Sequence, residues 1–328
     1  MNAAICVALL LLLTVLYITS ITRKKQLRLR KERNESLATS RPPVVAVVSA
    51  PCLGSCGYNV SGYIPASYVK AIETAGAQVI VIPHFASPSE ILSVAKIASG
   101  MIFIGGHDAD ASWLSATSLL FNYSKEFHTP LFGVCLGFER ILQLSCGSDT
   151  ILEKVVASDV MLPVEWNYYL KSESVFFSSD VFQSRREDLL DMRKMGATYH
   201  YHQWGLSVHS FFGSEPLRQS LRVLAVASHR GLTFVNFVEA TDANIWGVQF
   251  HPEKISFEMS SNLSIDHSYQ NILNNRVFFD FFVAQSRVFS TTVESHFATD
   301  SLSINNYPLV YTGRTVGPMR NFTSIYII

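Results

Sequence analysis

One cysteine has the sequence surroundings of a nucleophile. Cys135 follows the apolar run 131–134 and precedes the helix-forming residues 136–142. This pattern predicts a buried strand, a sharp turn and a helix, with the thiol at the corner. Backbone N–H groups at the helix N-terminus would then lower the pKa of the thiol, which would attack as a thiolate. A buried structural cysteine shows the same local pattern, so other segments must decide between the two.

A nucleophilic thiol needs a base, and His251 is the best-placed candidate. Residues 245–250 are typical of a buried strand, and Pro252 cannot continue it, so we expect the strand to end at His251. Glu253 lies two residues further on, and in an extended backbone both side chains face the same side. The carboxylate would fix the tautomer of His251 and stabilise its imidazolium. Taken alone, His-Pro-Glu is more often an ordinary strand end.

The pair Gly105-Gly106 follows an apolar strand and is a candidate oxyanion site. Without a Cβ atom, the backbone can approach a substrate carbonyl and turn its N–H groups inward. The backbone N–H of Leu136 would be the second donor, because this residue follows the nucleophile. A tight turn after a strand is the simpler interpretation of the two glycines.

Other polar residues carry weaker signals. His202 is flanked by aromatic residues in 199–204 and is a candidate pocket residue, although a core or surface histidine is commoner. A metal site at 107–110 is less favoured than a solvated loop. Cys52 and Cys56 lack a second ligand cluster, so we expect no metal site.

The elements that must position these residues alternate regularly. We predict strands at 44–48, 78–82, 101–104 and 131–134, and helices at 66–75, 89–98 and 111–127. Short connections between them indicate an α/β fold with a doubly wound, mostly parallel central sheet flanked by helices. Loops at the carboxyl ends of the strands should form the site, and both Gly106 and Cys135 lie there.

The second half of the chain is less regular. Short antiparallel strands are expected within 150–180 and a strand pair at 221–227 and 232–238. Helices are expected at 184–195 and 275–288, and the last forty residues are strand- and turn-like.

Composition limits the class of partner. The chain has 328 residues, 48% of them hydrophobic, which fits one large domain or two modest ones. Lys+Arg and Asp+Glu both number 26, so nothing indicates a nucleic acid as partner. A homodimer is left open. A disulfide among Cys52, Cys56 and Cys146 cannot be assigned from the sequence.

The N-terminal region is typical of a targeting segment. Residues 1–22 are a signal peptide or a signal anchor, residues 23–43 a basic linker, and residues 44–328 the catalytic domain. The basic flank would favour a cytosolic linker, whereas five sequons are acceptors only in a lumenal chain: Asn34, Asn59, Asn122, Asn262 and Asn321. We expect entry into the secretory pathway, with cleavage and membrane anchoring as open alternatives.

Two segments, 133–139 and 247–253, resemble the class I glutamine amidotransferase-like superfamily. Within it, the chain is most similar to the gamma-glutamyl hydrolases (folylpolyglutamate hydrolases). Three further segments carry this narrower resemblance: 62–77, the H-x-W-x-[LIV]-S element at 202–207, and 307–313. The likeness covers residue 44 to about 328.

The resemblance implies Cys135 as nucleophile, His251 as base and then acid, and Glu253 as third member. It also places His202 beside the substrate, and the oxyanion region at Gly105, Gly106 and Leu136. Ile104 departs from the family, which usually has proline there.

The implied activity is hydrolysis of gamma-glutamyl bonds in poly-gamma-glutamates, folylpoly-gamma-glutamates among them, through a thioester on Cys135 and without a cofactor. The substrate is a small molecule, and the implied location is a lysosome, a vacuole or the exterior. Two alternatives remain: a glutaminase-type amidotransferase module, and a catalytically silent lumenal member of the fold.

Overall fold

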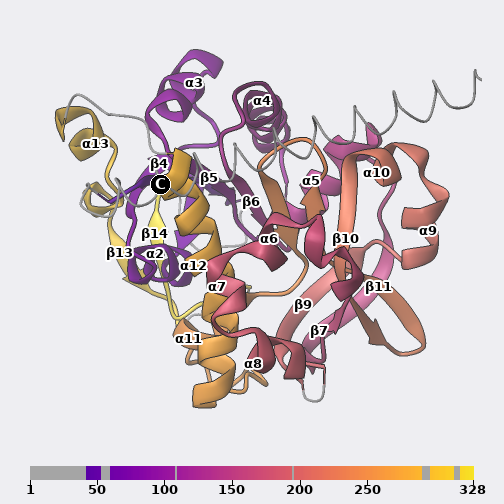
Figure 1. The fold of residues 1–328 in the computed structure, drawn as a ribbon. Coiled ribbons are helices and arrows are strands. Elements are labelled where there is room, and N and C mark those ends of the chain that lie inside the picture. Colours follow the sequence, from indigo (N-terminus) through magenta and orange to yellow (C-terminus); the bar gives the residue numbers. More distant parts are fainter. Residues whose placement is uncertain (1–41, 53–59, 108, 194–195, 290–295, 314–317) are drawn as a thin grey trace, which may run out of the picture. The chain divides into compact units, whose positions relative to one another are not determined.

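A computed structural model describes residues 42–328 except 53–59, 108, 194–195, 290–295 and 314–317 (Figure 1). From Pro42 onward the chain forms one compact unit. The expected targeting segment 1–22 and nearly all of the expected linker lie outside the described residues, together with Asn34, Asn59 and Cys56. Within the described ranges, no helix is both long and apolar enough to cross a membrane.

The core is an eight-stranded sheet in the order β4-β1-β5-β6-β12-β11-β10-β8. Its first five strands are parallel: β4 (Gln78–Ile82), β1 (Val44–Val48), β5 (Gly100–Phe103), β6 (Leu131–Val134) and β12 (Ile245–Val248). The predicted parallel α/β core is therefore confirmed. Four of these strands lie within a residue of the expected bounds, and β12 ends two residues before the expected end at 250.

The remaining three strands join by antiparallel pairing, so the sheet is mixed and mostly parallel, as expected. They are β11 (Leu232–Ala240), β10 (Leu221–His229) and β8 (Glu165–Trp166). The predicted strand pair is confirmed and each strand extends two residues further than expected. Arg230 and Gly231, both with positive φ (50° and 80°), join the pair, and so short a connection can only join antiparallel strands.

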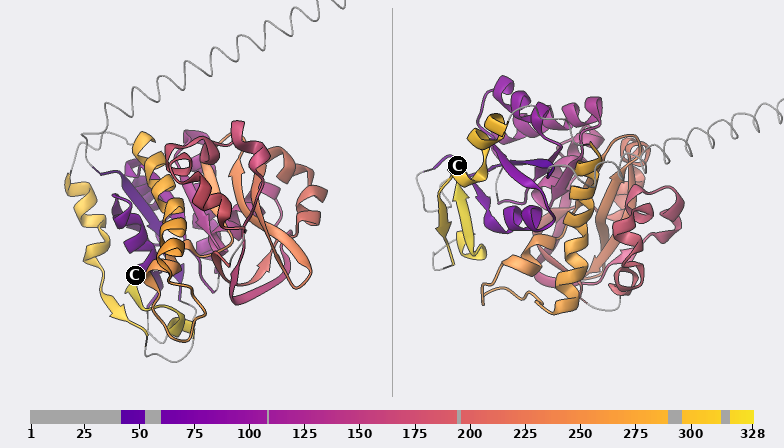
Figure 2. Two further views of the ribbon diagram at one scale, coloured as in Figure 1. Left: turned by 60° about the horizontal axis from the view of Figure 1, so that its bottom comes forward. Right: turned by 60° about the vertical axis from the view of Figure 1, so that its left-hand side comes forward.

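Helices cover both faces of the sheet (Figures 1 and 2). Val45 and Val47 of β1 pack into a cluster with α2 (Ala66–Thr74) and α12 (Tyr269–Phe289). Ala46 and Val48 pack into the opposite cluster, with α3 (Pro88–Ile97), α4 (Ala111–Phe127) and α5 (Leu136–Cys146). Because alternate residues of a strand face opposite sides, burial on both faces requires the continuous apolar run seen in β1.

Two smaller sheets flank the core. β7 (Glu153–Leu162) pairs with β9 (Thr198–Gly205), and a second sheet has the order β13-β14-β3-β2. The latter joins β13 (Leu309–Tyr311) and β14 (Ser324–Ile327) near the C-terminus to β3 (Gly62–Pro65) and β2 (Ala50–Pro51). The C-terminal strands are thereby held against the segment that leads into α2.

Some helix predictions need correction. The helix expected at 184–195 is described only as α8 (Arg186–Asp191), and α12 begins six residues before the expected start at 275. The last forty residues also contain a helix, α13 (His296–Leu302). Five further short helices complete the described fold: α6 (Val175–Ser178), α7 (Asp180–Gln183), α9 (Val208–Gly213), α10 (Glu215–Ser220) and α11 (Pro252–Phe257).

Candidate active site

Three segments far apart in the sequence meet at the carboxyl edge of the parallel strands. Gly105 follows β5, Cys135 follows β6, and His251 lies three residues after β12. A Cβ atom added to Gly105 would lie 2.8 Å from His251 Cε1 and 3.3 Å from Cys135 Cβ. The imidazole and the cysteine thus flank the same glycine, as the sequence predicted.

Cys135 occupies a strained corner. Its backbone has φ 51° and ψ −108°, although it is not a glycine, and it caps the N-terminus of α5. Such a conformation costs on the order of 1–3 kcal/mol and persists where the surrounding packing enforces it. Part of that packing comes from Gly137, where an added Cβ would lie only 2.0 Å from the Phe103 carbonyl oxygen. The strand–turn–helix prediction is confirmed, with α5 pressed against β5.

The protonation state of the thiol differs from the expectation. Burial raises the pKa of Cys135 well above its usual value, and the carboxyl groups of Glu139 and Glu253 raise it further when they are ionised. Lys254 and the N–H of Leu136 oppose this rise. The prediction of a depressed pKa was wrong because the whole side chain is removed from water, which disfavours the thiolate. The thiol is therefore protonated, and its Sγ lies 4.0 Å from the Tyr201 carbonyl oxygen.

His251 and Glu253 form a buried pair, but not through an extended strand. β12 ends at Val248, and Pro252 begins α11, so Glu253 lies in the first turn of a helix. The Nδ1 atom of His251 is 2.7 Å from Glu253 Oε1. Because a carboxylate can only accept, the Nδ1–H donates and leaves the Nε2 lone pair free to take a proton. Burial lowers the pKa of His251 while Glu253 opposes the shift, which suits a neutral base.

The glycine turn makes a contact that the sequence analysis missed. The Gly105 N–H donates to the hydroxyl of Tyr68, 2.8 Å away on α2. An added Cβ at Gly106 would lie 3.3 Å from the Leu136 side chain, so this residue borders the first turn of α5. Tyr68 lies within the segment 62–77 that resembles the hydrolases, yet a tyrosine on an amphipathic helix carries no local sign of a catalytic neighbourhood.

His202 lies on β9, the strand whose Tyr201 carbonyl faces the thiol. Its Nδ1 is 2.9 Å from the Trp204 carbonyl oxygen, and its Nε2 is 3.1 Å from His200 Nδ1. Burial lowers the pKa of His202 to about 4, so its ring is neutral. Both ring nitrogens of His202 therefore form hydrogen bonds within the protein. One of these partners is His200, a residue to which the sequence analysis gave no role.

A buried carboxyl group lies one turn into α5, the helix that follows Cys135. Glu139 Oε1 accepts a hydrogen bond from Gln249 Nε2 at 3.0 Å, and burial raises the pKa of Glu139 to about 8. The side chain is therefore protonated at neutral pH. The sequence analysis treated Glu139 only as part of a motif, because burial of a helical glutamate depends on what packs over it.

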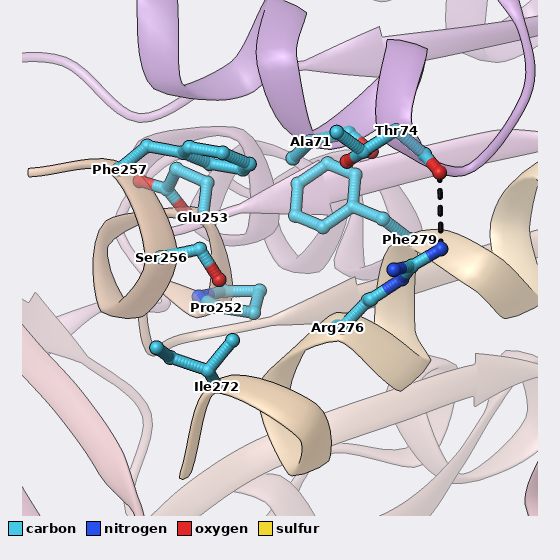
Figure 3. A pocket seen from close by; sticks show the side chains of 9 residues that line it. All are labelled: Ala71, Thr74, Pro252, Glu253, Ser256, Phe257, Ile272, Arg276 and Phe279. Carbon is cyan, nitrogen blue, oxygen red and sulfur yellow. Dashed lines mark hydrogen bonds between the residues drawn. The ribbon is translucent and has the colours of Figure 1, made fainter. Parts of the chain in front are cut away.

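A cavity of about 230 Å³ lies behind Glu253, between α2, α11 and α12 (Figure 3). Arg276 lines it and donates from Nη2 to the Thr74 carbonyl oxygen at 3.0 Å. Its other lining residues are Ala71, Pro252, Glu253, Ser256, Phe257, Ile272 and Phe279. Glu253 thus has the histidine on one side and a mainly apolar cavity on the other.

The described cysteines limit the disulfide question. Cys146 is a free thiol, with its Sγ 3.5 Å from Ser214 Oγ, and Cys135 is also free. Cys52 is disulfide-bonded. Of the three pairings left open by the sequence, those through Cys146 are therefore excluded.

The glutamine amidotransferase class-I family model matches residues 61–269, which include the glycine turn, the cysteine corner and the His-Pro-Glu segment. The chain belongs to this family.

Two gamma-glutamyl hydrolases are similar to this chain over most of its length and most of their own. Gamma-glutamyl hydrolase of Mus musculus is 27% identical over 84% of this chain and 87% of its own. Gamma-glutamyl hydrolase 2 of Arabidopsis thaliana is 29% identical over 83% of this chain and 79% of its own. Among solved structures, the glutaminase domain of a Trypanosoma brucei CTPS matches 74% of this chain and 93% of that domain, with 16% identity and a TM-score of 0.47.

Proposed function

We propose that this protein is a cysteine-dependent hydrolase that cleaves gamma-glutamyl bonds of poly-gamma-glutamates, folylpoly-gamma-glutamates among them. One observation carries the proposal. The free thiol of Cys135 and the His251–Glu253 pair flank the same glycine turn. The relatives that match most of this chain are gamma-glutamyl hydrolases. This combination of thiol, imidazole, carboxylate and N–H donors is the set that acyl transfer requires.

The first half-reaction forms a thioester. His251 Nε2 takes the proton of the Cys135 thiol as Sγ attacks the gamma-carbonyl carbon of the substrate. Because the pKa of the thiol is raised by burial, proton transfer accompanies the attack rather than preceding it. The Leu136 and Gly106 N–H groups are our candidates for stabilising the oxyanion, since the Gly105 N–H already donates to Tyr68. His251 then returns the proton to the leaving amine nitrogen, and a gamma-glutamyl thioester remains.

The second half-reaction releases the acid. A water molecule gives its proton to His251 Nε2 and adds to the thioester carbonyl, and the thiolate leaves and regains a proton from the imidazolium. Glu253 stabilises the imidazolium in both halves through the 2.7 Å hydrogen bond to Nδ1. We assign His202 to the wall of the substrate site, as a neutral ring rather than a proton carrier.

The test is incubation with a folate pentaglutamate and mass analysis of the products. Wild-type protein should release glutamate or short gamma-glutamyl peptides, and Cys135→Ser should release none. Cys146→Ser is the matched control, because this free thiol lies at the far end of α5, and it should keep wild-type activity. Activity on free glutamine alone would instead favour a glutaminase module, and activity retained by Cys135→Ser would refute the thiol mechanism.

We also propose that the protein enters the secretory pathway and acts in a lysosome, a vacuole or outside the cell. Two of the expected acceptors, Asn122 and Asn262, are exposed, whereas Asn321 is only 7% exposed and is a poor acceptor in the folded protein. A mass shift with peptide-N-glycosidase that is reduced in the double variant Asn122→Gln, Asn262→Gln would support this location. N-terminal sequencing of the mature protein distinguishes a cleaved signal from a retained anchor.

A further inference from the structure

Tyr68 stands between two parts of the proposed site. It is completely buried on α2, and its hydroxyl oxygen accepts the Gly105 N–H at 2.8 Å. The same hydroxyl lies 3.5 Å from His251 Nδ1. A single oxygen thus contacts both the glycine turn and the catalytic imidazole, which come from different strands of the sheet.

The hydroxyl proton of Tyr68 also needs an acceptor, because the side chain is completely buried. His251 Nδ1 is not that acceptor, because it carries the proton it donates to Glu253 Oε1 at the much shorter distance of 2.7 Å. Glu253 Oε2 is buried and has no hydrogen-bond partner among the described residues. A buried carboxylate oxygen without a donor is costly, and the Tyr68 hydroxyl has a proton to donate.

Helix packing places the two groups together. α2 contacts α11 directly, and Ala71, one turn after Tyr68, lines the same cavity as Glu253 (Figure 3). The charge of Glu253 is, after burial, the largest influence raising the pKa of Tyr68. The hydroxyl is therefore neutral and able to donate, and the carboxylate is close enough for its charge to act on it.

We propose that Tyr68 is a positioning residue: its hydroxyl accepts from Gly105, donates to the Glu253 carboxylate, and so fixes the glycine turn relative to the His251–Glu253 pair. This proposal rests on the proposed hydrolase function. It has two consequences. The two hydrogen bonds of Tyr68 hold the oxyanion donors at a fixed distance from His251. The hydrogen bond from Tyr68 also reduces the charge with which Glu253 stabilises the His251 imidazolium. Both consequences can be measured.

The central variant is Tyr68→Phe, which removes one oxygen. We expect kcat for a gamma-glutamyl peptide to fall by roughly 10- to 100-fold with KM changed less than about 3-fold, since loss of positioning affects the transition state more than substrate binding. Without the tyrosine donor, Glu253 stabilises the imidazolium more strongly, so the acid limb of kcat/KM should move to higher pH. An unchanged kcat and acid limb would overturn the proposal, as would a rise in kcat from freeing the Gly105 N–H.

The matched control is Tyr199→Phe. This buried tyrosine also donates a hydrogen bond, to Asp159 at 2.9 Å, but its hydroxyl does not contact Gly105 or Glu253. It should leave kcat and the acid limb unchanged. Incorporation of 3-fluorotyrosine at position 68 keeps the shape and makes the hydroxyl a stronger donor, so the acid limb should move to lower pH. This opposite sign keeps the proposal testable even if Tyr68→Phe folds poorly.

A second measurement does not depend on turnover. Chloroacetamide alkylation of Cys135, followed at pH 6 by mass analysis of its peptide, reports how readily the thiol passes its proton to His251. In Tyr68→Phe the rate should rise by about 2- to 5-fold, because the imidazolium is better stabilised. If wild-type protein cleaves no gamma-glutamyl substrate, the proposed function fails while this rate still decides the role of Tyr68. An alkylation rate equal to that of wild type would overturn that role.

Discussion

His200 Nδ1 lies 3.1 Å from His202 Nε2, and both rings are buried. The direction of this hydrogen bond follows from its surroundings. Because the Trp204 carbonyl can only accept, His202 carries its proton on Nδ1, and its Nε2 must accept from His200. The Trp204 carbonyl therefore fixes the tautomer of His202, and His200 holds the orientation of this ring, which we place beside the substrate.

Replacing His200 should accordingly destabilise the protein. His200→Leu leaves His202 Nε2 without a donor and should lower the free energy of unfolding by about 1–3 kcal/mol. His200→Asn offers an amide donor at the same position and should lose less. Urea unfolding of the two variants measures the difference, and equal losses would mean that packing rather than the hydrogen bond is responsible.

The buried Glu139 carboxyl makes stability depend on pH. Its pKa is about 8 in the folded protein, against about 4.3 in an unfolded chain. Because the pKa is raised on folding, protonated Glu139 stabilises the folded protein. This contribution to the free energy of unfolding is complete below about pH 4.3 and is lost as the pH rises through about 8. Relative to Glu139→Gln, wild type should therefore lose up to about 4 kcal/mol of unfolding free energy between pH 5 and pH 8. A constant difference between the two proteins across this range would contradict the assignment.

The close packing of α5 on β5 predicts a severe effect at Gly137. An added Cβ would lie 2.0 Å from the Phe103 carbonyl oxygen, and only a displacement of α5 from β5 could relieve this clash. Gly137→Ala should cost at least about 3 kcal/mol or prevent folding. Gly213→Ala is the control, because nothing lies within 4 Å of its added Cβ, and it should change the melting temperature little.

Neutralising Glu253 tests its share of the proposed chemistry. Glu253→Gln can still hydrogen bond to His251 but no longer stabilises the imidazolium by charge, so kcat should fall by roughly 100-fold or more. Glu253 raises the pKa of His251 in the folded protein, so the acid limb of kcat/KM should move to lower pH in the variant. A pH profile that keeps its wild-type acid limb would mean that protonation of His251 does not determine that limb.

Much of the fold was predictable because it depends on short-range patterns. Continuous apolar runs such as 44–48 and 131–134 predict buried parallel strands, and the short segment 228–231 between two strand-like runs predicts the β10–β11 pair. Weakly patterned segments were less predictable. The strand containing His202 pairs with β7, some forty residues earlier, and neither strand has the apolar run of the core.

The sequence by itself determined that Cys135, His251 and Gly105 follow three separate core strands, because residue order and hydrophobic pattern suffice to place them at one sheet edge. Only the tertiary structure decided how these groups behave. Burial keeps the thiol protonated and makes Glu139 a neutral acid, and packing of α2 brings the Tyr68 hydroxyl to Gly105. Protonation and hydrogen bonding depend on neighbours that are distant in sequence, and removal from water follows from the complete packed fold.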